Sequence, residues 1–189
     1  MRILEINKIM MPICVDLDGT LISEDITVIS VKKFLTQSLW NIFKIMVWYF
    51  YGMPYLKKRV AQQINVDVSE LTYNRKLLEF LKKKKVEGHK IFLATASDEI
   101  LANKVADFLK IFDGVFASDG HAYLKAEVKA NTLMTIFGEK GFIYAGNSIH
   151  DVPVWRKAAE SILVNPDADA VAMMKGHEYK LLEDLFDEK

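Results

Sequence analysis

The sequence predicts an α/β fold: a doubly wound, Rossmann-like parallel sheet with a small inserted α-helical cap. Five short apolar runs have the composition of strands buried on both faces, and they lie at 12–17, 90–95, 114–118, 142–145 and 161–165. Helical patterns follow three of them, at 98–112, 125–137 and 151–159. This alternation is typical of a parallel sheet with right-handed crossovers.

One interval breaks the alternation. About 70 residues separate the first two predicted strands, which is too long for a single crossover connection. Helices are predicted there at 29–51, 54–64 and 71–87. We interpret residues 21–87 as a helical cap inserted after the first strand, with residues 1–20 and 88–189 forming the core domain. Such a cap would cover the carboxyl ends of the strands, where open α/β sheets bind ligands.

The composition narrows the class of protein. The chain has 25 basic and 25 acidic residues, a balance that gives no support for nucleic-acid binding. Cys14 is the single cysteine, so an internal disulfide is excluded and a reducing, cytoplasmic compartment fits. Cys14 itself is expected to be a buried packing residue. Residues 1–11 carry scattered charges and lack the apolar run of a secretory signal.

The most informative motif is Asp16-Leu17-Asp18-Gly19-Thr20, directly after the first apolar strand. Residues two apart in a strand point to the same side, so both aspartates can face one small volume. Two carboxylates at a buried strand end repel each other and lose solvation unless a cation is present. Mg²⁺ prefers oxygen ligands and commonly accompanies phosphate. The motif therefore predicts a phosphoryl-transfer site, whereas a simple turn would explain Asp18 but not Asp16.

Three further segments fall where predicted strands end. Phe92-Leu93-Ala94-Thr95-Ala96-Ser97 places hydroxyl groups before a helix, where phosphate binds well, although these residues could merely cap that helix. Lys125 opens the helix after the third strand, and Lys129, one turn on, is expected at the surface. Gly146-Asn147-Ser148-Ile149-His150-Asp151 places an amide and a carboxylate after the fourth strand.

Together these segments resemble the haloacid dehalogenase (HAD) superfamily of aspartate-nucleophile phosphatases, in order and spacing over nearly the whole chain. The helical insert resembles that superfamily's first cap type, C1. More narrowly, Ala94 to Glu99, Ala117 to Gly120 and Gly146 to Ser148 resemble the HAD-like domain fused to UbiA-family prenyltransferases. The transferase is not in this sequence, which is interpreted as either a stand-alone protein or one domain of a fusion.

The resemblance implies a mechanism that the residue types support. Asp16 would attack phosphorus, and Asp18 would protonate the leaving oxygen and later activate water. Thr95 and the backbone around Leu17, Gly19 and Ala96 would hold the phosphoryl oxygens. Lys125 would balance the charge. The ligands of Mg²⁺ would be Asp16, the Asp18 backbone carbonyl, Asn147 and Asp151.

Asn147 departs from the commonest pattern, in which an acidic residue stands at this position. One negative charge is lost, so we expect weaker metal binding. This variant supports an alternative of another class, in which a weak or inactive HAD-like module docks on a membrane or on a prenyltransferase partner. The narrower resemblance also carries Gly-Asn-Ser, which favours a family variant that keeps its activity.

Residues 39–56 are unusually aromatic and precede Lys57, Lys58 and Arg59. This combination is typical of a membrane interface or of lipid-phosphate binding, which would place the protein at the inner face of the membrane. The alternative, purely structural interpretation is that these aromatic residues form the core of the cap. A prenyl or lipid phosphate is therefore the predicted substrate, and a small polar phosphate such as phosphoserine is the alternative.

Overall fold

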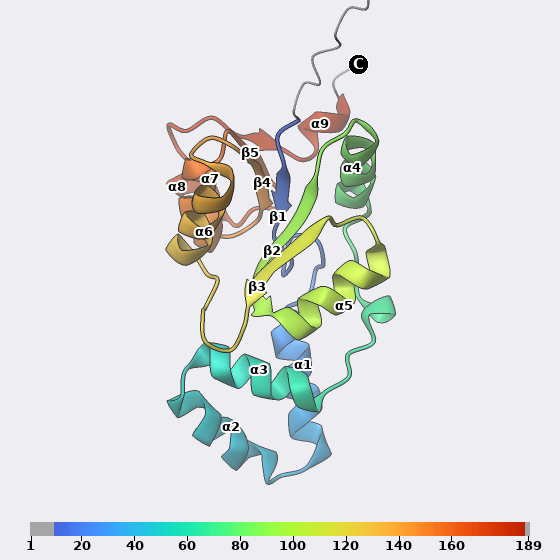
Figure 1. Ribbon diagram of the computed structural model, residues 1–189, viewed down its shortest axis with the longest axis vertical. Helices are drawn as coiled ribbons and strands as arrows, with labels where there is room; N and C mark the ends of the chain where they lie inside the picture. The colour runs from blue at the N-terminus through green and yellow to red at the C-terminus, as the bar shows by residue number, and fades with distance from the viewer. Residues whose placement is uncertain (1–9, 188–189) are drawn as a thin grey trace, which may run out of the picture.

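The computed structural model describes residues 10–187 and contains one six-stranded, all-parallel sheet with helices on both faces (Figure 1). Residues 1–9, where no secretory signal is expected, lie outside the described part of the chain. The strand order is β3-β2-β1-β4-β5-β6. The strands are β1 (Ile13–Val15), β2 (Ile91–Asp98), β3 (Gly114–Ser118), β4 (Ile143–Gly146), β5 (Glu160–Leu163) and β6 (Lys180–Leu181). The predicted α/β class is confirmed, and only the short edge strand β6 was not expected.

The sheet topology decides where a ligand can bind. β1 lies in the middle, with β2 on one side and β4 on the other, and the strand order runs outward in both directions from it. This reversal is the switch point at which doubly wound sheets leave a crevice at the carboxyl ends of the strands. Asp16 and Asn147 directly follow two of these strands, β1 and β4.

Successive side chains of β1 point to opposite faces of the sheet and so belong to two separate layers of the core. Ile13 and Val15 belong to the cluster that contains the buried residues of α4 (Arg75–Val86) and α5 (Glu99–Leu109). Cys14 belongs to the opposite cluster, with residues of α6 (Glu127–Phe137) and α7 (Val152–Lys157). The Cys14 side chain is fully buried, as predicted, and burial raises the pKa of its thiol, which argues against a nucleophilic role.

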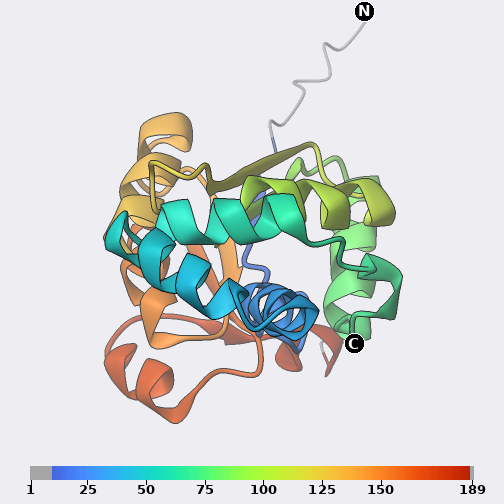
Figure 2. The same ribbon diagram turned by 90° about the horizontal axis from the view of Figure 1, so that it is seen from below.

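Three helices lie beyond the carboxyl ends of the strands: α1 (Ile26–Gln37), α2 (Asn41–Phe50) and α3 (Met53–Gln63) (Figures 1 and 2). The single helix predicted at 29–51 is wrong, because the chain turns at Ser38, whose backbone is extended. The Asn41 side chain donates a 2.7 Å hydrogen bond to the Phe34 carbonyl, which satisfies the end of α1 and holds the two helices as a hairpin. The apolar pattern continues through this turn and does not reveal it.

The two ends of the insertion lie side by side. An antiparallel bridge joins Ile22 to Tyr73, and the Ser23 amide donates a 3.0 Å hydrogen bond to the Thr72 carbonyl. Helix α4 begins just after this bridge and runs alongside the sheet, although it falls within the range 21–87 expected for the cap (Figure 1). The helices beyond the strand ends are thus α1 to α3, and the exact division into domains stays a prediction.

The remaining elements are short: the 3-10 turns η1 (Val68–Glu70) and η2 (Ile149–Asp151), and the helices α8 (Ala168–Met173) and α9 (Asp184–Asp187). Within residues 10–187, the helices are too short or too polar to cross a bilayer.

Candidate active site

A cavity of about 210 Å³ lies at the carboxyl ends of the central strands, under the cap. Each of the four predicted segments contributes to its lining, with Asp16, Asp18, Ala96, Lys125, Asn147 and Asp151. The structure therefore brings together most of the residues that the sequence singles out. Leu17 and Thr95 are fully buried beside the cavity, where Leu17 can contribute only its backbone.

Lys129 occupies the centre of this site. Its ammonium donates hydrogen bonds to Asp16 Oδ1 at 2.7 Å, to the Tyr144 hydroxyl at 2.8 Å and to Asp151 Oδ1 at 3.3 Å. The Lys129 residue is only 3% exposed, so its expected surface position is wrong. The reason lies at the start of α6, which begins two residues later than predicted because Ala126 adopts a positive φ of 49°. The first turn of α6 then directs Lys129 toward the sheet.

The charges of this cluster depend on one another. Burial raises the pKa of Asp16 to about 7, against the opposing attraction of Lys129. Burial alone would lower the pKa of Lys129, but the Asp16 and Asp151 carboxylates outweigh it and the pKa is raised. Lys129 therefore stays positively charged and holds the Asp16 carboxylate in place.

Lys125 lines the same cavity and is half-buried, with its ammonium 6.0 Å from the centre of the Tyr123 ring. Among residues 10–187 it makes no ion pair with Asp16 or Asp18. Its proposed role of charge balance on the phosphate stays a prediction, while the contact with the Asp16 carboxylate belongs to Lys129.

Asp151 holds several neighbouring groups of the site in place through its two carboxylate oxygens. Its Oδ1 accepts hydrogen bonds from Lys129 and, at 2.6 Å, from the Tyr144 hydroxyl. Its Oδ2 accepts from the amides of Asn147 and Ser148, both at 3.1 Å. The residue is 1% exposed. Because both oxygens are already used, Asp151 fits a residue that orients its neighbours better than a direct metal ligand.

Asp18 is held by the segment that follows β1 and by β2. Its Oδ2 accepts a 2.6 Å hydrogen bond from the Ser97 hydroxyl and a long, 3.5 Å one from Thr95, while Oδ1 accepts from the Ile26 amide at 2.8 Å. Burial raises the pKa of Asp18, although the bonds from Ser97 and Ile26 oppose this effect. A raised pKa suits a carboxyl group that must donate a proton near neutral pH.

Ser97 was not predicted as a site residue, because a helix cap was the favoured interpretation of this hydroxyl when it was considered in isolation. The cap of α5 is in fact Asp98, whose side chain accepts from the Ile100 amide. Ser97 is instead fully buried and contacts both Asp18 and, at 3.1 Å, the Thr27 hydroxyl of α1. It thereby links the core to the cap.

Gly19 and Asn147 lie against each other. Gly19 has a φ of +75°, and a Cβ built there would lie 2.4 Å from Asn147 Nδ2. Asn147 Oδ1 accepts a 3.1 Å hydrogen bond from the Thr20 hydroxyl. The glycine is needed both for the turn after β1 and for room beside the amide.

The donor set suits a hard divalent cation. Asp16, Asp18 and Asn147 border one cavity, and Asp16 Oδ2 accepts no hydrogen bond from residues 10–187. Among those residues, no three His, Cys, Asp or Glu side chains form a cluster able to hold a metal. A Mg²⁺ ion would therefore rely on amide and backbone oxygens besides Asp16, which are ordinary ligands for it.

The cap supplies charged groups to the cavity. Lys57 of α3 is 8% exposed, donates a 2.8 Å hydrogen bond to the Ala96 carbonyl and lies 5.1 Å from the centre of the Tyr123 ring. Burial lowers the pKa of Lys57, with Asp18 opposing. Asp25, just before α1, also lines the cavity, whereas the aromatic residues of 39–51 do not. Lys57 was predicted as part of a basic cluster at a membrane interface or a lipid phosphate, and not as one of the site residues.

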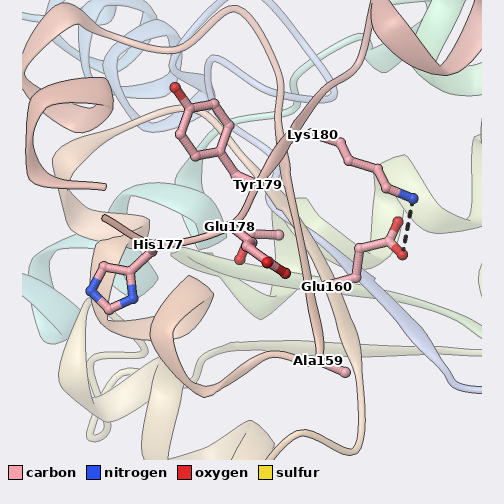
Figure 3. Close-up of a pocket in the computed structure, with 7 residues that line it drawn as sticks. Ala159, Glu160, His177, Glu178, Tyr179 and Lys180 are labelled. Carbon is pink, nitrogen blue, oxygen red and sulfur yellow. Dashed lines mark ion pairs between the residues drawn. The ribbon is translucent and has the colours of Figure 1, made fainter. Parts of the chain in front are cut away.

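A second hollow, of about 490 Å³, lies at the amino ends of β5 and β6 (Figure 3). Its lining comes entirely from residues 159–161 and 177–180, and Lys180 forms a 3.4 Å ion pair with Glu160 across it. The four motif segments contribute nothing to this lining, so the cavity at the carboxyl ends is the candidate active site.

Comparisons of the sequence with known proteins gave one informative match. No family model matches the chain. An uncharacterized protein of Sinorhizobium fredii is 33% identical over 154 residues, which are 82% of this chain but 30% of the relative. The chain thus spans about a third of the length of that curated relative. This match leaves the resemblance to prenyltransferase-fused domains a prediction.

Two solved structures place the fold more narrowly. A HAD family hydrolase of Salmonella enterica serovar Typhi is similar with a TM-score of 0.63 and 18% identity, over 89% of this chain and 67% of the other. A substrate-bound phosphoserine phosphatase is similar with a TM-score of 0.63 and 17% identity, over 94% and 97%. This chain therefore has the fold of the HAD-type hydrolases.

Proposed function

We propose that the protein is a Mg²⁺-dependent phosphomonoester phosphatase that works through an aspartyl-phosphate. The observation that carries the proposal is the Asp16 carboxylate at the end of the central strand, held 2.7 Å from Lys129 and bordering the same cavity as Asp18. A buried carboxylate fixed beside a cation and open to a small cavity suits nucleophilic attack on phosphorus.

The residues divide the reaction between them. Asp16 forms the bond to phosphorus as the bond to the leaving oxygen breaks, and Asp18 gives that oxygen a proton. Asp18 then takes a proton from water, which attacks the aspartyl-phosphate, releases inorganic phosphate and regenerates Asp16. Lys129 offsets the negative charge around Asp16 throughout. Bound Mg²⁺ would supply further charge stabilisation for the transferring phosphoryl group.

The cavity itself bears on the substrate class. Its volume of about 210 Å³ and its cap residues Asp25 and Lys57 favour a phosphomonoester with a small polar group next to the phosphate. The solved phosphoserine phosphatase with the same fold is consistent with such a substrate. A prenyl or lipid phosphate, which was the substrate expected from the sequence, becomes the alternative, because the aromatic run that suggested it lies outside the cavity lining.

Hydrolysis of an aryl phosphate tests the proposal. Wild type should be active with Mg²⁺ and lose activity with a chelator, and Asp16→Asn should fall to the background rate. Asp107→Asn, at an exposed carboxylate on α5, is the matched control and should keep full activity. Intact-mass analysis after an acid quench should detect a phosphorylated form of wild type but not of Asp16→Asn. An active Asp16→Asn variant would refute the mechanism.

One observation favours a second candidate function. Asn147 occupies the position where an acidic ligand is commonest, so the chain could instead be a docking module with little turnover. A panel of phosphomonoesters distinguishes the two: no Mg²⁺-dependent turnover of any member, from a folded protein, would favour the module.

A further inference from the structure

Helix α2 exposes apolar side chains to an unusual degree. Asn41 is its one buried residue, and Phe43, Met46, Val47 and Phe50 are 60%, 55%, 54% and 85% exposed. The flanking Trp40 and Tyr51 are 74% and 70% exposed. Monomeric proteins rarely leave large contiguous apolar patches in contact with water, and such patches mark interaction sites.

The helical period gathers these side chains on one face. Asn41, Ile45 and Trp48 follow a spacing of four and three residues and point inward, where Trp48 stacks on Phe34 with ring centres 5.3 Å apart. On the opposite side, Phe43, Met46, Val47 and Phe50 share one face by the same spacing. We call these four residues the outer face of α2. It is apolar although nothing in residues 10–187 covers it.

The charged residues of the segment that contains α2 are all basic. Residues 26–66, which include α1, α2 and α3, contain no Asp or Glu, although the whole chain has 25 of them. The same segment contains six basic residues, namely Lys32, Lys33, Lys44, Lys57, Lys58 and Arg59. Among residues 10–187, no carboxylate pairs with Lys32, Lys33, Lys44 or Arg59. Lys33 donates a 2.7 Å hydrogen bond to the Asn65 carbonyl, and the positive charge of all four side chains is left without an anionic partner in this part of the chain.

The position of α2 leaves its outer face accessible. It packs against α1 and α3 and lies at the end of the molecule farthest from β1 and from α9 (Figure 1). Arg59 of α3 is close by, 5.6 Å from the Trp48 ring centre and 5.8 Å from that of Tyr55. An apolar helix face edged by Trp, Tyr and unpaired cations is the chemistry of an interfacial helix.

We propose that the outer face of α2 inserts into the surface of an anionic lipid bilayer. Phe43, Met46, Val47 and Phe50 would enter the boundary between head groups and acyl chains, with Trp40 and Tyr51 at head-group level. Lys44 and Arg59 would lie near the lipid phosphates. The proposal does not depend on turnover, because none of these residues lines the cavity.

Vesicle flotation tests the proposal with the full chain. Wild type should bind vesicles of phosphatidylcholine and phosphatidylglycerol in equal parts more tightly than vesicles of phosphatidylcholine alone, and high salt should weaken the binding. The double substitution Phe43→Ser and Phe50→Ser should lower the partition coefficient at least about tenfold. Lys44→Gln should lower it about fivefold on anionic vesicles only.

The matched control is Phe186→Ser, at a phenylalanine that is 43% exposed in α9, at the opposite end of the molecule. It should bind vesicles like wild type. Fluorescence adds a positional readout, since brominated lipids should quench Trp40, whereas the buried Trp155 should be spared. A thermal melt of each variant shows that the fold persists.

Three outcomes would overturn the proposal: no binding of wild type to anionic vesicles, equal loss with Phe186→Ser, or unchanged binding by the double variant. A fourth is a stable dimer in sedimentation velocity that the double variant dissociates, without vesicle binding. In that case a second copy of the chain covers α2.

Discussion

Replacing Lys129 by methionine is the sharpest test of how the site is held together. The substitution keeps a long apolar side chain and removes the ammonium that lies 2.7 Å from Asp16 and 3.3 Å from Asp151. Both carboxylates are buried, so they would be left without their cation. Removing one partner of a buried ion pair costs about 3–5 kcal/mol of unfolding free energy. For a chain of this size, that corresponds to a fall in Tm of about 6–20 °C.

Lys125→Met is the matched control four residues away. Lys125 is half-buried and has no carboxylate partner among residues 10–187, so its loss should change the unfolding free energy by about 0.5 kcal/mol or less. Calorimetric melts and urea titrations measure both effects. In an aryl phosphatase assay, Lys129→Met should also lower kcat by about 10²–10³-fold.

The reasoning would be refuted by a Lys129→Met variant that melts like wild type, or by a Lys125→Met variant that loses as much stability. Either result would mean that Lys129 does not carry the charge balance of the buried carboxylates.

Three further substitutions test individual contacts. Ser97→Ala removes the 2.6 Å hydrogen bond to Asp18 and should lower kcat about tenfold, most clearly with a phosphate ester whose leaving group is poor; equal rates would contradict the contact's role. Asn147→Asp adds a carboxylate at the cavity and should tighten Mg²⁺ binding in a calorimetric titration, and weaker binding would argue against a metal there. Gly19→Ala places a Cβ 2.4 Å from Asn147 Nδ2 at a φ of +75° and should cost about 1–2 kcal/mol in urea unfolding, which an unchanged midpoint would disprove.

Much of the core could be predicted because its rules are local. The strands are recognisable in the sequence as apolar runs. The carboxyl ends of parallel strands lie at one edge of a sheet, so the segments containing Asp16, Thr95 and Asn147 were expected to lie together. The pair Asp16 and Asp18 was recognisable because no buried strand end tolerates two carboxylates without a chemical reason.

The direction in which individual side chains point could not be predicted in the same way, because it depends on contacts between distant segments. Lys129 and Lys125 look alike in the sequence, and only the positive φ of Ala126 and the delayed start of α6 decide which of them faces Asp16. Ser97 and Lys57 reach the site through contacts between core and cap, at Asp18 and at the Ala96 carbonyl. Such contacts depend on how two segments dock, which residue spacing does not encode.

The aromatic run of 39–56 shows a different limit. Its composition indicated either a cap core or an apolar surface, and the structure contains both: Trp48 turns inward onto Phe34, whereas Phe43 and Phe50 remain exposed. The break at Ser38 decides this division, because it reorients α2 relative to α1. A continuous helical pattern gave no sign of that break.

The bridge between Ile22 and Tyr73 has a consequence for the folding kinetics. Pairing β1 with β2 joins Ile13 to Ile91 across the whole cap, a contact between residues far apart in the chain. If the cap forms first and closes at the bridge, the open loop left between the two strands shrinks by more than half. The entropic cost in free energy of closing this loop then falls by about 1 kcal/mol. The cap would thus speed the search for the central strand pairing.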